Sequence, residues 1–198
     1  AVLTSIDLAT TRLKVLPSGF ASHCAALTDV VLPATLTSIG DDVLSGCVSL
    51  KTLDIPASVR HIGKAFLCST RIVAVQLPAV LETLGTAAFM YSKSLPMIDL
   101  AQTQLTSLPD SFANSCPALT DVVLPAALEE LGDFVFQRCP RLRAAGVTIP
   151  ANAALRAVGV DFGVKGIELP AELGRGAFGR YAAAAPPALP PSVGKNAS

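Results

Sequence analysis

The chain contains no Trp, only 5% aromatic residues and only 15% charged residues, and its positive and negative charges balance. Without net charge it has no general attraction to nucleic acid or to anionic membranes. With so few aromatic residues it also lacks surfaces on which bases could stack. Pro, Gly or charged residues interrupt every apolar run before the roughly 20 residues that a membrane span needs. We therefore expect neither nucleic-acid binding nor membrane insertion.

Residues that carry catalysis are scarce as well. His23 and His61 are the only histidines, and their positions do not match the base and orienting group that a Cys–His nucleophile needs. The stretch 174–179 fits G-x-G-x-x-G by letters, but no acidic residue follows it, as a dinucleotide site requires. No C-x-x-C pair indicates a zinc site. We expect no enzyme activity, no metal and no cofactor.

What the chain does have is a repeat. Leu-Thr-Asp-Val-Val-Leu-Pro at Leu27 returns at Leu119, 92 residues later, and altered copies between them make this about four units of 23. An apolar residue closes each copy, at Leu8, Leu32, Ile55, Leu77, Leu100, Leu124, Ile149 and Leu169. A period in the low twenties indicates a leucine-rich-repeat solenoid, here of about eight coils. We expect it over residues 1–181, with a degenerate last coil from about residue 164, followed by an Ala/Pro-rich tail over 182–198.

The unit over residues 50–72 shows how one coil is built. Leu53 and Ile55 alternate as on one face of a strand, and Pro56 ends it because Pro cannot donate to the ladder. Residues 59–62 form a second short extended segment, and Gly63 closes it at a turn that we expect to need unusual backbone angles. A short helical or 3₁₀ turn follows. The predicted fold is an α/β solenoid, a horseshoe of short parallel strands.

Two other kinds of residue recur with the repeat. The turn position is held by Gly40, Gly63, Gly85, Gly132 and Gly159, with Pro17 and Pro109 at the matching place, and an inward aromatic or Leu by Phe20, Leu44, Phe66, Phe89, Phe112, Phe136 and Phe162. The cysteines Cys24, Cys47, Cys68, Cys116 and Cys139 fall eight to ten residues before a closing residue, with Ser92 in the remaining unit. We expect one buried ladder of free thiols. A disulfide between neighbouring coils is the alternative, which parallel inward side chains disfavour.

Residues 36–47 followed by 50–56, Leu-Thr-Ser-Ile-Gly-Asp-Asp-Val-Leu-Ser-Gly-Cys and Leu-Lys-Thr-Leu-Asp-Ile-Pro, resemble the BspA-type leucine-rich repeat over roughly residues 1–170. The resemblance implies a non-catalytic protein-binding module, surface-displayed or secreted, in bacteria and protists. An intracellular scaffold or structural subunit is the alternative, which the unpaired cysteines and the lack of a signal peptide favour. Because the first residues already lie inside an ordinary repeat, we expect a fragment of a longer protein.

A partner would meet the side chains that alternate with the inward ones on the inner strands. These predict a mildly acidic face with an apolar patch near its centre and a basic residue beside it. We expect a protein partner to bind this concave face, whose candidate residues are Asp29, Lys51, Asp54, Val73, Ala74, Gln76, Pro96, Met97, Asp99 and Asp121.

Overall fold

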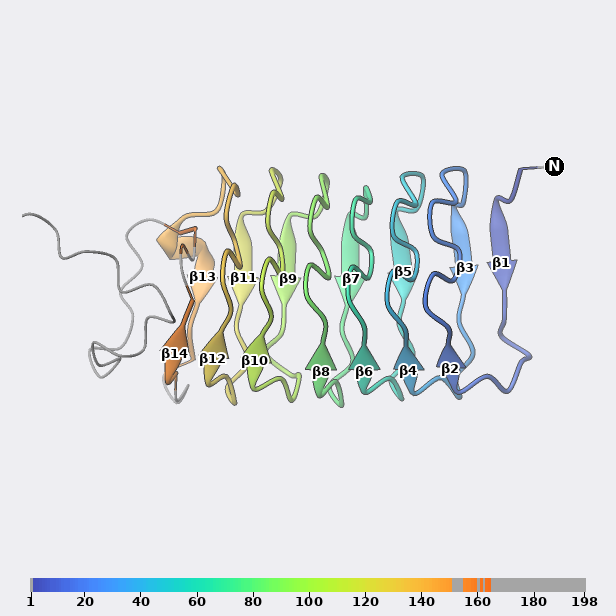
Figure 1. The fold of residues 1–198 in the computed structure, drawn as a ribbon, viewed down its shortest axis with the longest axis horizontal. Coiled ribbons are helices and arrows are strands. Elements are labelled where there is room, and N and C mark those ends of the chain that lie inside the picture. Colours follow the sequence, from blue (N-terminus) through green and yellow to red (C-terminus); the bar gives the residue numbers. More distant parts are fainter. Residues whose placement is uncertain (1, 151–154, 160, 162, 165–198) are drawn as a thin grey trace, which may run out of the picture.

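The computed structural model describes residues 2–150, 155–159, 161, 163 and 164 of the 198. Each coil contributes one strand to each of two parallel arrays, which run side by side along the molecule (Figure 1). The first sheet holds β1 (Ser5–Asp7), β3 (Asp29–Val31), β5 (Thr52–Asp54), β7 (Ala74–Gln76), β9 (Met97–Asp99), β11 (Asp121–Val123) and β13 (Val147–Thr148). The second holds β2 (Val15–Leu16), β4 (Ser38–Ile39), β6 (His61–Ile62), β8 (Thr83–Leu84), β10 (Ser107–Leu108), β12 (Glu130–Leu131) and β14 (Ala157–Val158).

We number the coils from the first, which starts at β1, to the seventh, which starts at β13. The described residues thus complete about six turns, fewer than the eight coils predicted; the copy that ends at Leu169 and the tail lie outside them. The register confirms the 23-residue spacing, since Ser5 pairs with Asp29, Ser38 with His61, and Ser107 with Glu130. All strand pairs are parallel, as a one-directional solenoid requires.

The prediction of a helical turn in each coil was wrong. Across the described residues the one helical element is the 3₁₀ turn η1 (Ala144–Gly146). The third side of each coil is instead a series of tight turns with left-handed residues two or four positions apart, such as Asp42, Leu44 and Gly46. Their N–H groups donate across coils, for example Gly46 to the Cys68 carbonyl at 2.8 Å. This side therefore has its own inter-coil ladder without extended strands.

The core lies between these three sides and is filled by stacked Leu, Ile, Val and Phe. Four fully buried rings form a row, with centroids 6.3 Å apart for Phe66–Phe89, 5.5 Å for Phe89–Phe112 and 6.1 Å for Phe112–Phe136. All three contacts are edge-to-face, the arrangement that the ring quadrupole favours.

The edge-to-face row follows from where the rings are attached. Hydrogen bonds between coils, such as that from the Ala113 N–H to the Val135 carbonyl, show which residues of successive coils are equivalent. In this register, Phe alternates between two adjacent positions from one coil to the next. Its neighbour in sequence is small in two of these coils, Ala88 beside Phe89 and Ala113 beside Phe112. The prediction of a single aromatic position is therefore corrected to two, and the alternation offsets each ring from the next.

The recurring glycines serve close approach rather than unusual backbone angles. Gly40, Gly63, Gly85, Gly132 and Gly159 have no positive φ, in contrast to Gly19 and Gly46. A Cβ on Gly85 would lie 2.4 Å from the backbone C of Gly63 and the N of Lys64 in the preceding coil. The expectation of strained turn angles was wrong: these glycines let neighbouring backbones stack.

The strand ladders are interrupted at particular places. The first sheet is broken between β3 and β5 and between β7 and β9, and the second between β8 and β10. Only between coils four and five of the described residues are both sheets broken, and we call this boundary the seam. The turn side continues across it, since Ala87 donates to Asp110 and Phe89 to Phe112.

Candidate functional site

The structure places all ten candidate residues on the exposed face of the first sheet or directly beside it. Met97 and Val73 are the large apolar members, 46% and 43% exposed. The register puts Met97 beside Asp121 and Asp54 beside Gln76. Asp29 lies on β3, across the interruption between β3 and β5, so the face is not one continuous ladder.

Four of these residues converge on a hollow of ≈ 430 Å³ at the seam. Ala74 and Gln76 line it from β7, and Met97 and Asp99 from β9. The other lining residues were not predicted: Val75, Leu77, Gln102 and Thr103. The hollow thus combines partly buried apolar side chains with exposed amides, a carboxylate and a thioether, the composition of a small recognition pocket.

Two departures from the repeat in coil five account for the hollow. In coils two and six, Thr28 and Thr120 donate their N–H to the preceding coil. Pro96 occupies the equivalent position in coil five and has no N–H, so the bond from coil five to coil four is missing here. Coil five also has one more residue than most coils between its closing residue and its second strand, since Leu108 follows Leu100 by eight positions and Leu84 follows Leu77 by seven. These features were visible in the sequence and could have identified Gln102 and Thr103.

The extra residue is accompanied by a local cap. Coils two, three, four, six and seven carry Pro directly after the closing residue. Coil five has Ala101 there, and its N–H donates to the Asp99 carboxylate at 2.9 Å. The Thr103 hydroxyl donates to the Leu100 carbonyl at 2.8 Å. Coil one repeats both bonds 92 residues earlier, from Ala9 to Asp7 and from Thr11 to Leu8. Asp99 therefore holds the backbone at the rim of the hollow through the Ala101 N–H and also places a negative charge there.

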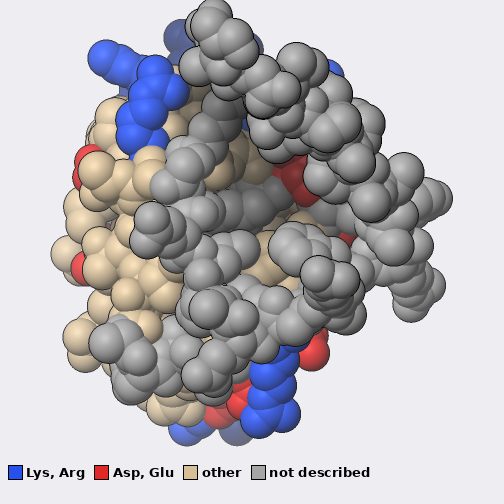
Figure 2. Space-filling model, turned by 90° about the vertical axis from the view of Figure 1, so that its left-hand side faces the viewer, with Lys and Arg blue, Asp and Glu red and all other residues tan. Residues whose placement is uncertain are grey.

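The exposed face is acidic along the strands. The seven first-sheet strands contain Asp7, Asp29, Asp54, Asp99 and Asp121 and no Lys or Arg. At the C-terminal end of the solenoid, Lys and Arg lie at the upper edge, whereas Lys or Arg and Asp or Glu lie side by side at the lower edge (Figure 2). The first-sheet strands are therefore acidic although the chain as a whole is neutral.

The cysteines occupy the predicted ladder with one exception. The thiols of Cys47, Cys116 and Cys139 each donate to a carbonyl of the preceding coil at 3.1 Å, and the Ser92 hydroxyl makes the same bond at 3.2 Å. Cys68 lies outside this column. Its carbonyl accepts from the Gly46 N–H just as the Ser45 carbonyl accepts from the His23 N–H, so Cys68 is equivalent to Ser45. The buried Thr70 takes the ladder position in coil three. All five cysteines are free.

Burial raises the pKa of two of the ladder thiols and keeps them protonated. It raises the pKa of Cys47 from 9.0 to about 11. The hydrogen bond with Cys139, together with burial, raises the pKa of Cys116 above the ordinary range of a thiol. A thiolate could not donate to the carbonyls that these groups contact, so the ladder suits structural rather than nucleophilic cysteine.

We expect alkaline pH to destabilise the fold partly through Cys47. Its thiol ionises near pH 9 when unfolded and near 11 when folded, so its stabilisation is complete below pH 9 and is lost between pH 9 and 11. The loss is up to about 1.4 kcal/mol per pH unit. Urea unfolding of the native chain and of Cys47→Ser at pH 8 and pH 10.5 measures it, because Ser keeps the donor but does not ionise. Equal pH dependence of the two chains would contradict this assignment.

The remaining candidates for chemistry do not form a site in the described part of the chain. His61 contacts Thr83 at 3.0 Å, and no hydrogen bond joins His61 or His23 to a cysteine there. Over the described residues no three His, Cys, Asp or Glu side chains are placed to hold a metal ion. Nor does any helix there have the length and apolarity to cross a bilayer. The 174–179 motif lies outside the described residues.

Comparison with solved structures supports the fold. A leucine-rich repeat protein from Bacteroides ovatus superposes with a TM-score of 0.71 at 21% identity, over 83% of this chain and 42% of that one. The leucine-rich repeat protein of T. pallidum gives 0.65 at 20% identity, over 81% of this chain and 73% of that one. The pneumococcal vaccine antigen PcpA gives 0.50 at 17%, over 79% of this chain and 41% of that one. This chain therefore spans less than half the length of two of these three proteins.

Sequence comparison is consistent with this result. No curated protein matches the chain. The family profile described as "BspA type Leucine rich repeat region" matches six copies over residues 14–143. That range covers β2 to β12, the recurring glycines except Gly159, and all five cysteines. The chain belongs to the BspA-type leucine-rich repeat family.

Proposed function

We propose that the chain is a non-catalytic recognition module that binds a protein partner through its first-sheet face, centred on the hollow at the seam. The observation that carries the proposal is the hollow between β7 and β9, where two strands lie next to each other along the solenoid without pairing. Proteins of this family generally serve as binding modules, which agrees with this role.

The physical case rests on the make-up of this face. Met97 and Val73 expose apolar surface at its centre, and the partly buried Val75 and Leu77 line the hollow between them and the core. Polar groups of Gln76, Asp99 and Gln102 surround this apolar surface. An apolar centre within a polar rim is the arrangement in which a few anchoring contacts supply most of the binding free energy.

The proposed setting is the cell surface or the secreted fraction, where the chain would act in adhesion or ligand capture. Membership of the family supports this setting, and one structural neighbour is described as a vaccine antigen. The alternative is a cytoplasmic scaffold, which the five free cysteines favour because thiols persist in reducing compartments. Labelling of intact cells with an antibody against the chain separates the two: surface signal supports the first, and signal only after permeabilisation supports the second.

The binding face is tested by replacing Met97 with Lys. We expect partner affinity to fall by at least about tenfold, as for the loss of a central anchor in an interface. Binding to protein captured from the producing cells is measured by biolayer interferometry. Asp99 is left unchanged because its carboxylate holds the Ala101 N–H.

Val15→Lys is the matched control, since Val15 is an apolar side chain of the second sheet and 54% exposed. This variant should bind like the native chain. Undiminished binding by a folded Met97→Lys chain, or an equal loss in Val15→Lys, would show that the first-sheet face is not the binding surface.

A further inference from the structure

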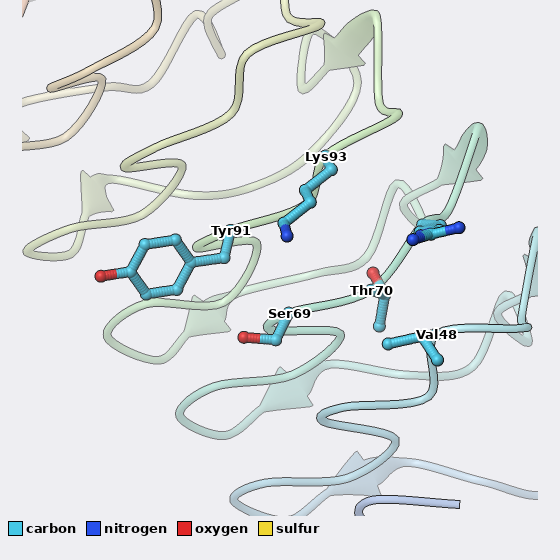
Figure 3. Close-up of a pocket in the computed structure, with 6 residues that line it drawn as sticks. Val48, Ser69, Thr70, Tyr91 and Lys93 are labelled. Atoms are coloured by element: carbon cyan, nitrogen blue, oxygen red, sulfur yellow. The ribbon is translucent and has the colours of Figure 1, made fainter. Parts of the chain in front are cut away.

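A second pocket, of ≈ 300 Å³, lies where the chain enters β7 and β9 from the turn side. Val48, Ser69, Thr70, Arg71, Tyr91 and Lys93 line it (Figure 3). The figure shows the Lys93 side chain extending from its own coil toward the neighbouring segment that carries Ser69 and Thr70. The pocket is separate from the hollow at the seam, because no residue lines both.

A missing residue in coil three explains the pocket. Gly46, Ser69 and Tyr91 are equivalent, since each donates its N–H to the corresponding carbonyl of the next coil. Strand β5 begins six residues after Gly46 and β9 six after Tyr91, but β7 begins only five after Ser69. The connection through Arg71 is therefore shorter than those on either side, which leaves a recess between Val48 of the preceding coil and Lys93 of the following one.

The charges of this pocket are unbalanced. Arg71 and Lys93 come from adjacent coils, both are exposed, and neither has an ion pair or a side-chain hydrogen bond among the described residues. No carboxylate lines the pocket. In contrast, two pairs of charges on adjacent coils are of opposite sign and form ion pairs, Arg60 with Glu82 and Arg156 with Glu129.

Two like charges on neighbouring coils repel each other, and an anion held between them would convert this repulsion into attraction. The pocket also offers the Ser69 hydroxyl as a donor and the side chains of Tyr91 and Val48, 41% and 42% exposed, as apolar surface. We propose that this pocket binds the carboxylate of an acidic side chain, with its methylene groups against Val48 or Tyr91. The inference rests on the proposed function only in taking the ligand to be a protein segment.

The surroundings favour a single carboxylate over a polyanionic glycan. A sulfated polysaccharide is held by an extended basic strip, whereas the flanking coils carry the uncharged Val48 and Pro117 at the equivalent positions. The chain as a whole has no net positive charge to attract a polyanion. The pocket volume is of the size needed for one side chain rather than a chain of sugars.

The test uses the full chain and a synthetic peptide of three glutamates flanked by glycines, with a glutamine peptide of the same length for comparison. Isotope-labelled protein is titrated by NMR at low salt. We expect saturable shifts of the Tyr91 ring and of the Arg71 and Lys93 amides with the glutamate peptide. The glutamine peptide should bind at least about tenfold more weakly, as expected where a charge-assisted contact is lost.

The variant Arg71→Gln/Lys93→Gln should lose at least about tenfold in affinity for the glutamate peptide. The control Lys14→Gln/Lys64→Gln removes the same charge from two exposed lysines outside the pocket and should bind within about twofold of the native chain. Equal binding of the two peptides, or an unchanged affinity in the pocket variant, would overturn the proposal.

A heparin oligosaccharide that shifts the same resonances at lower concentration than the glutamate peptide would also overturn it, in favour of a glycan ligand. The outcome is independent of the first-sheet face. If Met97→Lys leaves partner binding unchanged while the glutamate peptide still binds the pocket, the proposed binding face is wrong and the carboxylate pocket stands.

Discussion

Replacing Phe112 by Ala is expected to lower the free energy of unfolding by about 4 kcal/mol, as for a large side chain deleted from a packed core. The Phe112 ring is fully buried and lies between Phe89 and Phe136, with centroids 5.5 Å and 6.1 Å away. Neither neighbour can fill the cavity, because each is itself held edge-to-face in the row. This loss is a large fraction of the free energy of unfolding of a typical domain, which is about 5–15 kcal/mol.

The same substitution is expected to split unfolding into two transitions. The stability of a solenoid is approximately the sum of terms for each coil and for each contact between neighbouring coils. At the seam both sheets are interrupted, so the contact of Phe89 with Phe112 and the turn-side hydrogen bonds carry much of the coupling. Weakening this contact lets the coils on one side unfold while those on the other stay folded.

Urea unfolding followed by circular dichroism, with hydrogen exchange to locate the first transition, measures both effects. Phe112→Leu is the control: it keeps most of the volume and should cost about 1 kcal/mol with a single transition. A Phe112→Ala chain that unfolds in one step with a loss below that of Phe112→Leu would contradict the role of the ring row at the seam.

The period, the two strands of each coil and the inward apolar positions could be read from the sequence because each depends on residues that recur. Leu53 and Ile62 are buried, and Asp54 and His61 beside them are exposed, as alternation along a strand requires. The candidate residues on the strands are exposed for the same reason, whereas Lys51, Val73 and Pro96 lie directly before a strand. Which of them a partner contacts is not specified by the pattern, and their role stays a prediction.

Features that depend on contacts between coils could not be obtained by counting along the chain. Counting back from Leu77 predicts Cys68 in the thiol ladder, but coil three lacks one residue before β7, and Thr70 takes the position instead. The hollow at the seam likewise depends on Pro96 and an extra residue in coil five, and the basic pocket on a residue lost from coil three. Both candidate sites therefore occur where the repeat is irregular.

Substituting Gly85 by Ala tests whether the recurring glycines are needed for space. The added Cβ would meet the backbone of Gly63 and Lys64 at 2.4 Å, well inside van der Waals contact. These backbone atoms cannot rotate away as a side chain could, and the Gly85 N–H is bonded to the Ile62 carbonyl at 2.9 Å. Coils three and four would have to separate, so we expect a loss of about 3 kcal/mol, at the upper end for overpacking.

Gly19→Ala provides the comparison because it isolates the conformational effect. Gly19 has φ +75°, and no atom lies within 4 Å of the position of its Cβ. Ala there pays only the cost of a left-handed backbone, about 1 kcal/mol. If the ladder glycines were needed for their backbone angles, the two substitutions would cost the same in a thermal or urea unfolding experiment. A loss about three times larger for Gly85→Ala than for Gly19→Ala would show that the stacking distance between coils selects glycine at this position.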